Sequence, residues 1–423
     1  MRKKNWVVTL VALLGFQAGG AVVSAKDYVV DETDIKITYA VNTTDLIARV
    51  KKVETVYLSK RQSVEIPKTL KYKSGSKTYN LTVTKIGDNA FEHIDYKTIK
   101  LPNTITHIGK RAFAYTSSTE INVPSQLQSI GEEAFAYSDI RSFNIPGTVT
   151  YIGPYAFWAA PISSVSFQES DAPLSIGAGA YCGAAVREVT LPARLASLGP
   201  RSFCMCASLE SFTMSYCGIT KIPEQCFHSS ELLRNVNLPS NISEIGENAF
   251  WRCYSLSDIV WPTALKTIGD EAFSDCNFKG IYFPAGLESI GEYAFESNDD
   301  LTIISFPASL RSIGQYGFLR CDRLSSVSCD AIVPPATVSP VFSDVSHVPL
   351  AVPVQSVEAY RTAPDWRNFS YEDYPTGVEG MMSSLDDCTE WYDLNGRRLE
   401  ERPTAGGIYI RKTPLSTEKH IIR

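Results

Sequence analysis

Hydrophobic and polar positions between residues 86 and 318 repeat with a period of 22 to 24 residues. The repeated unit is Ile-Gly-x-x-Ala-Phe or a close variant, and it occurs eleven times. The copies start at Ile86, Ile108, Ile130, Ile152, Ile176, Leu198, Ile222, Ile245, Ile268, Ile290 and Ile313. A repeat of this length with several apolar positions is typical of a solenoid, in which each rung contacts only its neighbours. We therefore expect function on a surface rather than in a central pocket.

Short segments of alternating apolar and polar residues recur at the same period, and most of them end in proline. Val64-Glu65-Ile66-Pro67 is one example. Such alternation predicts a short, half-buried strand, and proline ends the strand because it has no N–H for the sheet. Each rung should also bury the motif Ile, the motif Phe and a preceding apolar residue, as Val149 precedes Ile152. The sequence therefore predicts a mainly β solenoid with stacked ladders of isoleucine and phenylalanine.

The remaining segments flank the repeats. The polar insert Lys71–Lys77 is expected to form a hairpin or loop, and Ser356–Tyr360 a short helix. Asn395-Gly396 is a strong hairpin signal, and Gly407–Ile410 would add a third strand. The predicted organisation is a signal peptide at residues 1–25, an N-terminal cap at 26–63, repeats at 64–330, a C-terminal cap at 331–375, a linker at 376–385 and a small β-type module at 386–423.

The first residues have the pattern of a secretory signal peptide. A basic start, Arg2 to Lys4, precedes an apolar run from Trp6 to Phe16, and small residues lead to a cleavage site after Ala25. A membrane anchor is the alternative, but the apolar run is short for a span. No later apolar stretch is long enough to cross a membrane, so the mature chain is expected to have no span. Cleavage removes three positive charges and no negative ones, which changes the formal charge from −6 to −9.

The cysteines allow three interpretations. Four of them lie three residues after the motif aromatic, in a position that other repeats fill with small residues, so packing as free thiols in the core is favoured. Cys182 and Cys204 directly follow the motif aromatic in adjacent repeats, and stacked rungs would bring them within disulfide range. A metal site among Cys182, Cys204, Cys206, Cys217 and Cys226 is disfavoured, because their spacing is not that of a zinc knuckle.

The motif, the cysteine that follows it and the strand Leu256-Ser257-Asp258-Ile259-Val260-Trp261-Pro262 resemble the BspA-type leucine-rich repeats of bacterial surface proteins. The segment Ser356–Phe369 is similar to closing segments of such proteins from Bacteroidetes-like bacteria, and Trp391–Ile410 to their short C-terminal β modules. The resemblance implies a right-handed leucine-rich-repeat solenoid that is secreted or exposed on the cell surface. It also implies binding and adhesion, with a host matrix protein, another cell-surface protein or a glycan as partner.

Catalytic patterns are missing from the sequence. The five histidines form no metal-ligating pair, and there is neither a Gly-x-Ser-x-Gly elbow nor a phosphate-binding loop. We therefore expect no enzyme, no cofactor and no metal site. An acidic chain without evident basic clusters is also a poor candidate for nucleic acid binding. Two alternatives stay open, namely a structural surface component without a specific ligand and an exported enzyme that acts on glycans through carboxylates assembled across rungs.

Three outward strand positions depart from the small polar residues found elsewhere. They are Val260, Tyr282 and Ile303, in consecutive rungs. Stacking would place them in one exposed apolar patch, which is typical of an interaction site. The alternative is that they are ordinary strand-forming residues or that a neighbouring segment covers them. We predict a monomeric binding protein with this patch as its candidate partner site.

Overall fold

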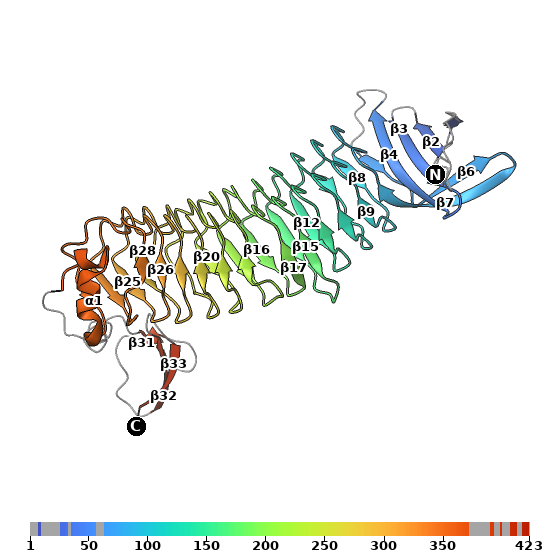
Figure 1. Cartoon of the computed structure of the whole chain (residues 1–423). Helices are drawn as coiled ribbons and strands as arrows, with labels where there is room; N and C mark the ends of the chain where they lie inside the picture. The colour runs from blue at the N-terminus through green and yellow to red at the C-terminus, as the bar shows by residue number, and fades with distance from the viewer. Residues whose placement is uncertain are drawn as a thin grey trace. The chain divides into compact units, whose positions relative to one another are not determined.

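The computed structural model describes residues 7–9, 26–32, 35–55, 63–371, 390–392, 398–399, 407–412 and 417–422. The chain divides into two compact units, Met1–Val260 and Trp261–Arg423. Short parallel strands, one pair of strand positions per repeat, make up most of each unit (Figure 1). The predicted mainly β solenoid is therefore confirmed.

Unit 1 begins with an antiparallel sheet. The strands β2 (Lys26–Glu32), β3 (Ile35–Asn42) and β4 (Ile47–Thr55) pair in chain order. The strand β1 (Val7–Thr9) pairs with β2 in the full-length chain. It falls within the segment that we predict to be cleaved, and that cleavage stays a prediction.

A hairpin joins this sheet to the repeats. The strands β6 (Thr69–Ser74) and β7 (Lys77–Ile86) are antiparallel and are connected at Gly75 and Ser76, which confirms the hairpin expected near Lys71–Lys77. Gly75 has a φ of 61°, which suits glycine in a tight turn. The far half of β7 pairs in parallel with β4 and with the first rung, so the antiparallel cap continues into the parallel ladder.

The motif residue ends a short strand in every repeat. In unit 1, the strands β7, β9, β11, β13, β15 and β17 pair in that order, and β19 pairs with β21, all in parallel. Ile108, Ile130 and Ile152 are exact register partners along this ladder. The strands are β9 (His107–Ile108), β11 (Ser129–Ile130), β13 (Tyr151–Ile152), β15 (Leu174–Ile176), β17 (Leu195–Leu198), β19 (Lys221–Ile222) and β21 (Glu244–Ile245).

A second parallel set forms the strand face, which is the surface made by the outward residues of these strands. β12 buries Phe143 and Ile145 and exposes Asn144 between them, as the alternation predicts. The sheets run β5-β8-β10, β12-β14 and β16-β18-β20. The strands are β5 (Ser63–Glu65), β8 (Thr98–Lys100), β10 (Glu120–Ile121), β12 (Ser142–Ile145), β14 (Ser164–Phe167), β16 (Glu188–Leu191), β18 (Ser211–Met214) and β20 (Asn235–Asn237).

The motif aromatics stack through the core of unit 1. Successive ring centroids lie 4.9 to 6.0 Å apart, and the planes are tilted by 20° or less. The column consists of Phe91, Phe113, Phe135, Phe157, Tyr181, Phe203, Phe227 and Phe250, all fully buried. Because each ring contacts the ring of the rung before and after it, no rung completes its own core.

The turn that carries the motif has an unexpected backbone conformation. In most rungs both the residue before the motif Ala and the residue two after the motif aromatic have positive φ, as Arg111 (52°) and Tyr115 (56°) do. The N–H groups of Arg111, Phe113 and Tyr115 donate to carbonyl oxygens of the next rung at 2.7 to 2.9 Å. We call this side of the repeat the turn edge. The N–H groups of these alternate residues donate to the following rung, whereas the N–H of the motif glycine, as in Gly109, donates to the preceding one.

Unit 2 repeats the same plan. Its motif ladder runs β22-β24-β26-β28 and its strand face β23-β25-β27-β29. Phe273, Phe295, Phe318 and Phe342 stack at 5.2 to 5.6 Å. The strands are β22 (Thr267–Ile268), β23 (Gly280–Tyr282), β24 (Ser289–Ile290), β25 (Ile303–Phe306), β26 (Ser312–Ile313), β27 (Ser326–Cys329), β28 (Ala336–Thr337) and β29 (Leu350–Ala351).

A small helical segment closes the repeats of unit 2. It contains η1 (Val354–Ser356), α1 (Val357–Thr362) and η2 (Trp366–Asn368), which confirms the helix expected near Ser356–Tyr360. Trp366 is fully buried and contacts the rings of Phe306 and Phe342. An indole at this position covers the apolar end of the core.

The C-terminal segment forms a four-stranded antiparallel sheet in the order β31-β30-β32-β33. The predicted hairpin pairing is present between β30 and β31, and Gly407–Ile410 falls within β32. Asn395-Gly396 and the linker at 376–385 lie outside the described residues, so the domain boundaries stay predictions. The strands are β30 (Glu390–Tyr392), β31 (Arg398–Leu399), β32 (Gly407–Lys412) and β33 (Thr417–Ile422).

Candidate ligand-binding surfaces

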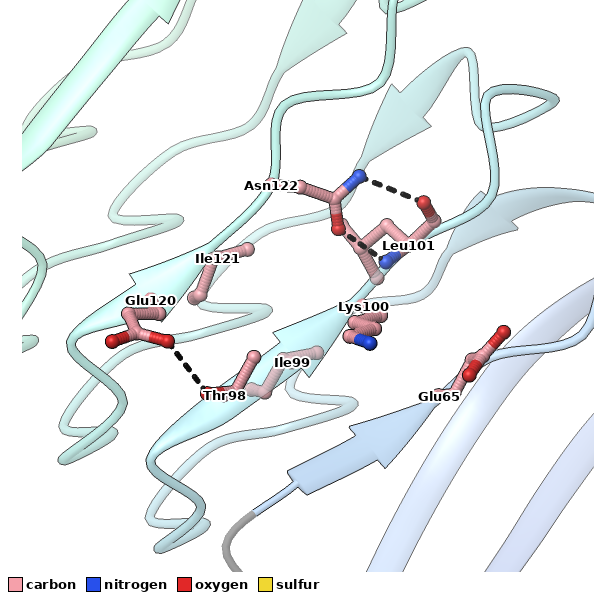
Figure 2. A pocket seen from close by; sticks show the side chains of 8 residues that line it. All are labelled: Glu65, Thr98, Ile99, Lys100, Leu101, Glu120, Ile121 and Asn122. Atoms are coloured by element: carbon pink, nitrogen blue, oxygen red, sulfur yellow. Dashed lines mark hydrogen bonds between the residues drawn. The ribbon is translucent and has the colours of Figure 1, made fainter.

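A shallow groove lies on the strand face of unit 1, across β5, β8 and β10 (Figure 2). Its volume is about 550 Å³. Buried Ile99, Leu101 and Ile121 form its base, and polar side chains stand above them. The polar residues of this strand-face groove are Glu65, Thr98, Lys100, Glu120 and Asn122.

Hydrogen bonds between rungs hold part of the groove in place. The Thr98 hydroxyl donates to a Glu120 carboxylate oxygen at 2.8 Å. Asn122 binds the backbone of Leu101 twice, because its Oδ1 accepts the N–H at 2.6 Å and its Nδ2 donates to the carbonyl at 2.8 Å. Figure 2 shows both interactions. The amide of Asn122 therefore continues the strand pairing where the proline at position 102 follows.

The three charged groups of the groove are available to a ligand. Glu65 is the register partner of Lys100, and Glu120 lies one strand further on. All three side chains are exposed, and none forms an ion pair with another residue that the structure describes. An ammonium flanked by two carboxylates, with a hydroxyl and an amide nearby, can form hydrogen bonds with a polar ligand that has both donors and acceptors. Nothing in the sequence marked this groove, because its residues come from three repeats.

The predicted apolar patch divides between the two units. Val260 is 72% exposed and ends unit 1, whereas Tyr282 and Ile303 are half-buried and belong to β23 and β25 of unit 2. Ile303 is the register partner of Gly280, and a side chain at Gly280 would come into van der Waals contact with the ring of Tyr282. Tyr282 and Ile303 therefore share one sheet face, while a continuous patch that includes Val260 stays a prediction.

Cys182 and Cys204 lie in adjacent rungs, as expected. The N–H of Gly183 donates to the Cys204 carbonyl at 2.8 Å, and the rings of Tyr181 and Phe203 stack at 5.3 Å. Both thiols are buried and free. Interaction with the Cys204 side chain lowers the pKa of Cys182, and interaction with Cys182 raises the pKa of Cys204, since the pair stabilises one thiolate at the expense of the other. The disulfide stays a prediction.

No metal centre emerges from the described part of the chain. No cluster of three or more His, Cys, Asp or Glu side chains there has the geometry to hold a metal ion. Within the same residues, no helix has the length and apolar character that crossing a membrane requires.

The family model for the BspA type leucine rich repeat region matches residues 69–174, 161–276 and 243–333. Together these ranges cover well over half of the chain. The chain belongs to the BspA-type leucine-rich-repeat family. No curated protein matches its sequence.

Two solved structures share the fold of this BspA-type protein. A leucine-rich repeat protein from Bacteroides ovatus is 24% identical, with a TM-score of 0.55, and the alignment covers 78% of this chain and 79% of that one. The pneumococcal vaccine antigen PcpA is 19% identical, with a TM-score of 0.52, and the alignment covers 81% and 96%. These similarities support the leucine-rich-repeat fold and say nothing about a shared ligand.

The BspA-type cysteine has a role that the sequence pattern did not show. The thiols of Cys206, Cys253 and Cys321 donate to the carbonyl of the motif aromatic in the preceding rung, at 3.1 to 3.3 Å. Ser230 and Asn298 make the same bond in their own rungs. Several rungs therefore place a buried donor at this position, whereas Ala160 and Ala184 fill it without one. The shared chemistry of Cys, Ser and Asn at this position was the available signal.

Exposed rings stack along part of the BspA-type turn edge. His93, Tyr115 and Tyr137 follow one another with centroids 4.8 and 5.0 Å apart, and Trp158 continues the row at 4.8 Å with a 60° tilt. Arg111 lies over Tyr115 at 5.6 Å and is ion-paired with Glu92. The aromatic residue two positions after the motif Phe, at His93, Tyr115 and Tyr137, was the signal for this row, and it was overlooked; Trp158 directly follows its motif Phe. Because the rings cover one another's faces, they offer mainly edges to a ligand.

Proposed function

We propose that this protein is a secreted or cell-surface binding protein without catalytic activity, and that it recognises an extracellular protein or glycan through the strand-face groove. The observation that carries the proposal is the set of exposed charges of Glu65, Lys100 and Glu120, which form no ion pair with any residue that the structure describes and lie above buried apolar side chains. Membership of a family whose proteins are usually secreted or surface-exposed supports the location.

The chemistry of the groove favours a polar ligand. Carboxylates accept hydrogen bonds from hydroxyl and amide groups, and Lys100 donates to carbonyl or hydroxyl oxygens. The neighbouring strand face carries mainly small polar residues such as Ser142, Asn144 and Ser166, which leave space for a chain to extend along the rungs. An extended peptide or an oligosaccharide meets these requirements.

The experiment is capture of partners from extracellular matrix and microbial surface extracts with the chain lacking residues 1–25, followed by mass spectrometry and glycan analysis. A saturable partner should bind the wild type and lose affinity for the variant Glu65→Ala/Lys100→Ala/Glu120→Ala. The control variant Glu188→Ala/Asn235→Ala/Asn237→Ala changes exposed strand-face residues outside the groove and should bind normally. Absence of a saturable partner would favour a purely structural component, and turnover of a captured glycan would favour an enzyme.

The other expectations belong to the same proposal. Export predicts that the protein recovered from culture medium begins at Lys26, which N-terminal mass analysis would reveal. The patch of Val260, Tyr282 and Ile303 is retained as a second contact for the partner. Replacement of all three by serine should weaken capture, and unchanged capture would remove the patch. A single species of monomer mass in size-exclusion chromatography is expected.

A further inference from the structure

The exposed rings on the turn edge of unit 1 have an orientation that limits what they can bind. His93, Tyr115 and Tyr137 stack with their planes only 17° and 7° apart. His93 is exposed, and Tyr115 and Tyr137 keep 38% and 40% of their surface exposed. Because the rungs follow one another along the solenoid, the ring faces point along it and the ring edges point outward. We call these three residues and Trp158 the ring row.

The outward edges of the ring row favour a ligand that presents hydrogen-bond acceptors. Cations and nucleic acid bases bind over the faces of aromatic rings, and here neighbouring rings cover those faces. The rim of an aromatic ring carries the positive end of its quadrupole, so it attracts oxygen atoms. The hydroxyls of Tyr115 and Tyr137 add donors, and no hydrogen bond within the described residues involves either of them. A chain with a succession of carbonyl groups meets these requirements.

The charged side chains beside the ring row have opposite charges close to them, which favours an uncharged ligand. Arg111 lies over Tyr115 at 5.6 Å and is ion-paired with two carboxylates. Those carboxylates belong to Glu92, at 2.6 Å, and Glu133, at 2.5 Å. On the other flank, each exposed acid is followed two residues later by an exposed base. These pairs are Asp95 with Lys97 and Asp139 with Arg141.

The spacing of the rings matches one kind of extended chain. A polyproline II helix has three residues per turn and rises about 3.1 Å per residue, so one turn measures about 9 Å. Two steps of the ring row, 4.8 and 5.0 Å, have nearly that length, whereas a β-strand repeats after about 7 Å. Residues i and i+3 of such a helix would therefore face His93 and Tyr137, with Tyr115 between them. Its carbonyl groups form no internal hydrogen bonds and stay available to the tyrosine hydroxyls.

Trp158 ends the ring row. Its ring centroid lies 4.8 Å from that of Tyr137, but the indole is tilted by 60° and is half-buried. Ala159 and Gly183 occupy the position of Tyr137 in this rung and the next, so no ring follows there. The indole face is therefore partly open at this end, and proline packs well against aromatic residues. Three steps of 4.8 to 5.0 Å correspond to about five residues of polyproline II.

We propose that the ring row binds a proline-rich segment of a partner protein in the polyproline II conformation. Prolines three residues apart rest on the rims of His93 and Tyr137, and a further proline packs on Trp158. The hydroxyls of Tyr115 and Tyr137 donate to backbone carbonyl oxygens of the segment. Such a segment is extended before it binds, so little conformational entropy is lost. The turn edge and the strand face are different sides of the repeat, so this site does not depend on the strand-face groove.

The test measures binding of fluorescent decaproline to the full chain by fluorescence anisotropy. Tyr115→Ala/Tyr137→Ala should bind at least about tenfold more weakly, because both aromatic anchors are lost. Alanine is compatible with this turn, since Ala159 occupies the equivalent position with a φ of 51°. Tyr115→Phe/Tyr137→Phe keeps the rings and should bind about threefold or more weakly, because the hydroxyls are lost. Between 50 and 200 mM salt the affinity should change less than about twofold, because the contacts are uncharged.

Matched controls separate the possible results. Tyr151→Ala/Tyr216→Ala removes two exposed tyrosines away from the turn edge and should leave binding intact. The groove variant Glu65→Ala/Lys100→Ala/Glu120→Ala should also bind decaproline, so the two sites can fail independently. No binding of decaproline, equal binding of a glycine–serine peptide of the same length, equal loss in the Tyr151/Tyr216 variant, or displacement of decaproline by cellohexaose would each overturn the proposal. Circular dichroism verifies that every variant is folded.

Discussion

At the scale of single residues, the repeats show how closely each position is specified by hydrogen bonding. The buried donor that follows the motif aromatic is one example, and Tyr181 is the opposite case. Tyr181 replaces phenylalanine in the aromatic column, and its hydroxyl is buried without a hydrogen-bond partner. Burial also raises the pKa of Tyr181, because the phenolate could not be solvated there. The hydroxyl oxygen of Tyr181 is therefore the one atom by which tyrosine suits this position less well than phenylalanine.

Replacing Tyr181 by phenylalanine should stabilise unit 1. The substitution keeps the stacked ring and removes a buried polar atom without a partner, which typically costs about 1–3 kcal/mol. Urea denaturation followed by fluorescence would show a higher midpoint for Tyr181→Phe. Tyr151→Phe is the control, because Tyr151 is exposed and its loss should change stability by less than about 0.5 kcal/mol. A lower midpoint for Tyr181→Phe would mean that the hydroxyl has a partner.

Cys253 should tolerate serine better than alanine. Its thiol donates to the Phe227 carbonyl at 3.3 Å, and Ser230 makes the equivalent bond one rung earlier. Cys253→Ala removes this bond but leaves the Phe227 carbonyl its bond from the Ser230 N–H at 2.9 Å, so it should cost about 0.5–1.5 kcal/mol, whereas Cys253→Ser should cost less. The same denaturation assay ranks the two variants. If serine were the more damaging replacement, packing volume rather than hydrogen bonding would govern the position.

At the scale of elements, the aromatic column couples each rung to the next. Phe135 stacks between Phe113 and Phe157 at 5.2 Å on both sides and also meets Phe143 of the strand face. Phe135→Ala should cost about 3–5 kcal/mol and loosen both neighbouring rungs. Limited proteolysis with mapping of the cuts would reveal new sites in rungs around residue 135. Cleavage confined to the termini, as in the wild type, would contradict coupling through the rings.

The adjacent rungs at Cys182 and Cys204 provide a second test of stacking. Parallel backbones about 4.8 Å apart place paired cysteines within disulfide range. The protein isolated from an oxidising medium should titrate two fewer thiols when denatured without reductant than with it. Cys182→Ala/Cys204→Ala should abolish that difference. An equal thiol count in both conditions for the wild type would establish free thiols and exclude the disulfide.

The structural features that could be predicted from the sequence are those that the residues of a single repeat determine. The motif isoleucine occurs at the same position of successive rungs, as at Ile108, Ile130 and Ile152. Its spacing in the sequence therefore predicted the ladder and the core. The positive φ at Arg111 and Tyr115 was not predictable, because unrelated residue types share these positions and the inter-rung hydrogen bonds determine the conformation. The groove was missed for a related reason, since Glu65, Lys100 and Glu120 meet only after three rungs stack.

At the scale of the whole molecule, the net charge of the chain does not show where charged residues cluster. The acidic net charge led us to expect no basic cluster, whereas the hairpin concentrates lysines within residues 66–87. The ends of the repeats also need particular residues that the composition of the chain does not reveal. In unit 2 the buried Asp365 accepts the N–H of Val341 and the hydroxyl of Ser339 through the same oxygen, at 3.1 Å each. A carboxylate thus receives donors that a further rung would otherwise bind.

Removal of this acceptor should weaken the C-terminal closure. Asp365→Ala leaves the Val341 N–H unpaired, at about 1–3 kcal/mol, and places alanine at a φ of 57°, at a further 1 kcal/mol or so. Asp365→Asn keeps an acceptor oxygen and tolerates that φ, so it should stay close to the wild type. Hydrogen exchange of residues 340–370 would measure the difference. Equal protection in the alanine variant would mean that Asp365 does not hold the closure.

The hydrogen bonds that run from rung to following rung give the turn edge of each unit an electrical direction. In unit 2 the N–H of Glu271 donates to the carbonyl of Glu292, that of Tyr293 to Gln315 and that of Tyr316 to Pro340. Each peptide unit carries a dipole of about 3.5 D, and in these rows the dipoles point the same way, as in an α-helix. The rows have their positive end at the C-terminal closure, where Asp365 places its carboxylate. The turn edge of a solenoid without long helices thus has the polarity of a helix, and it neutralises that polarity as helices do, with an acidic residue at the positive end.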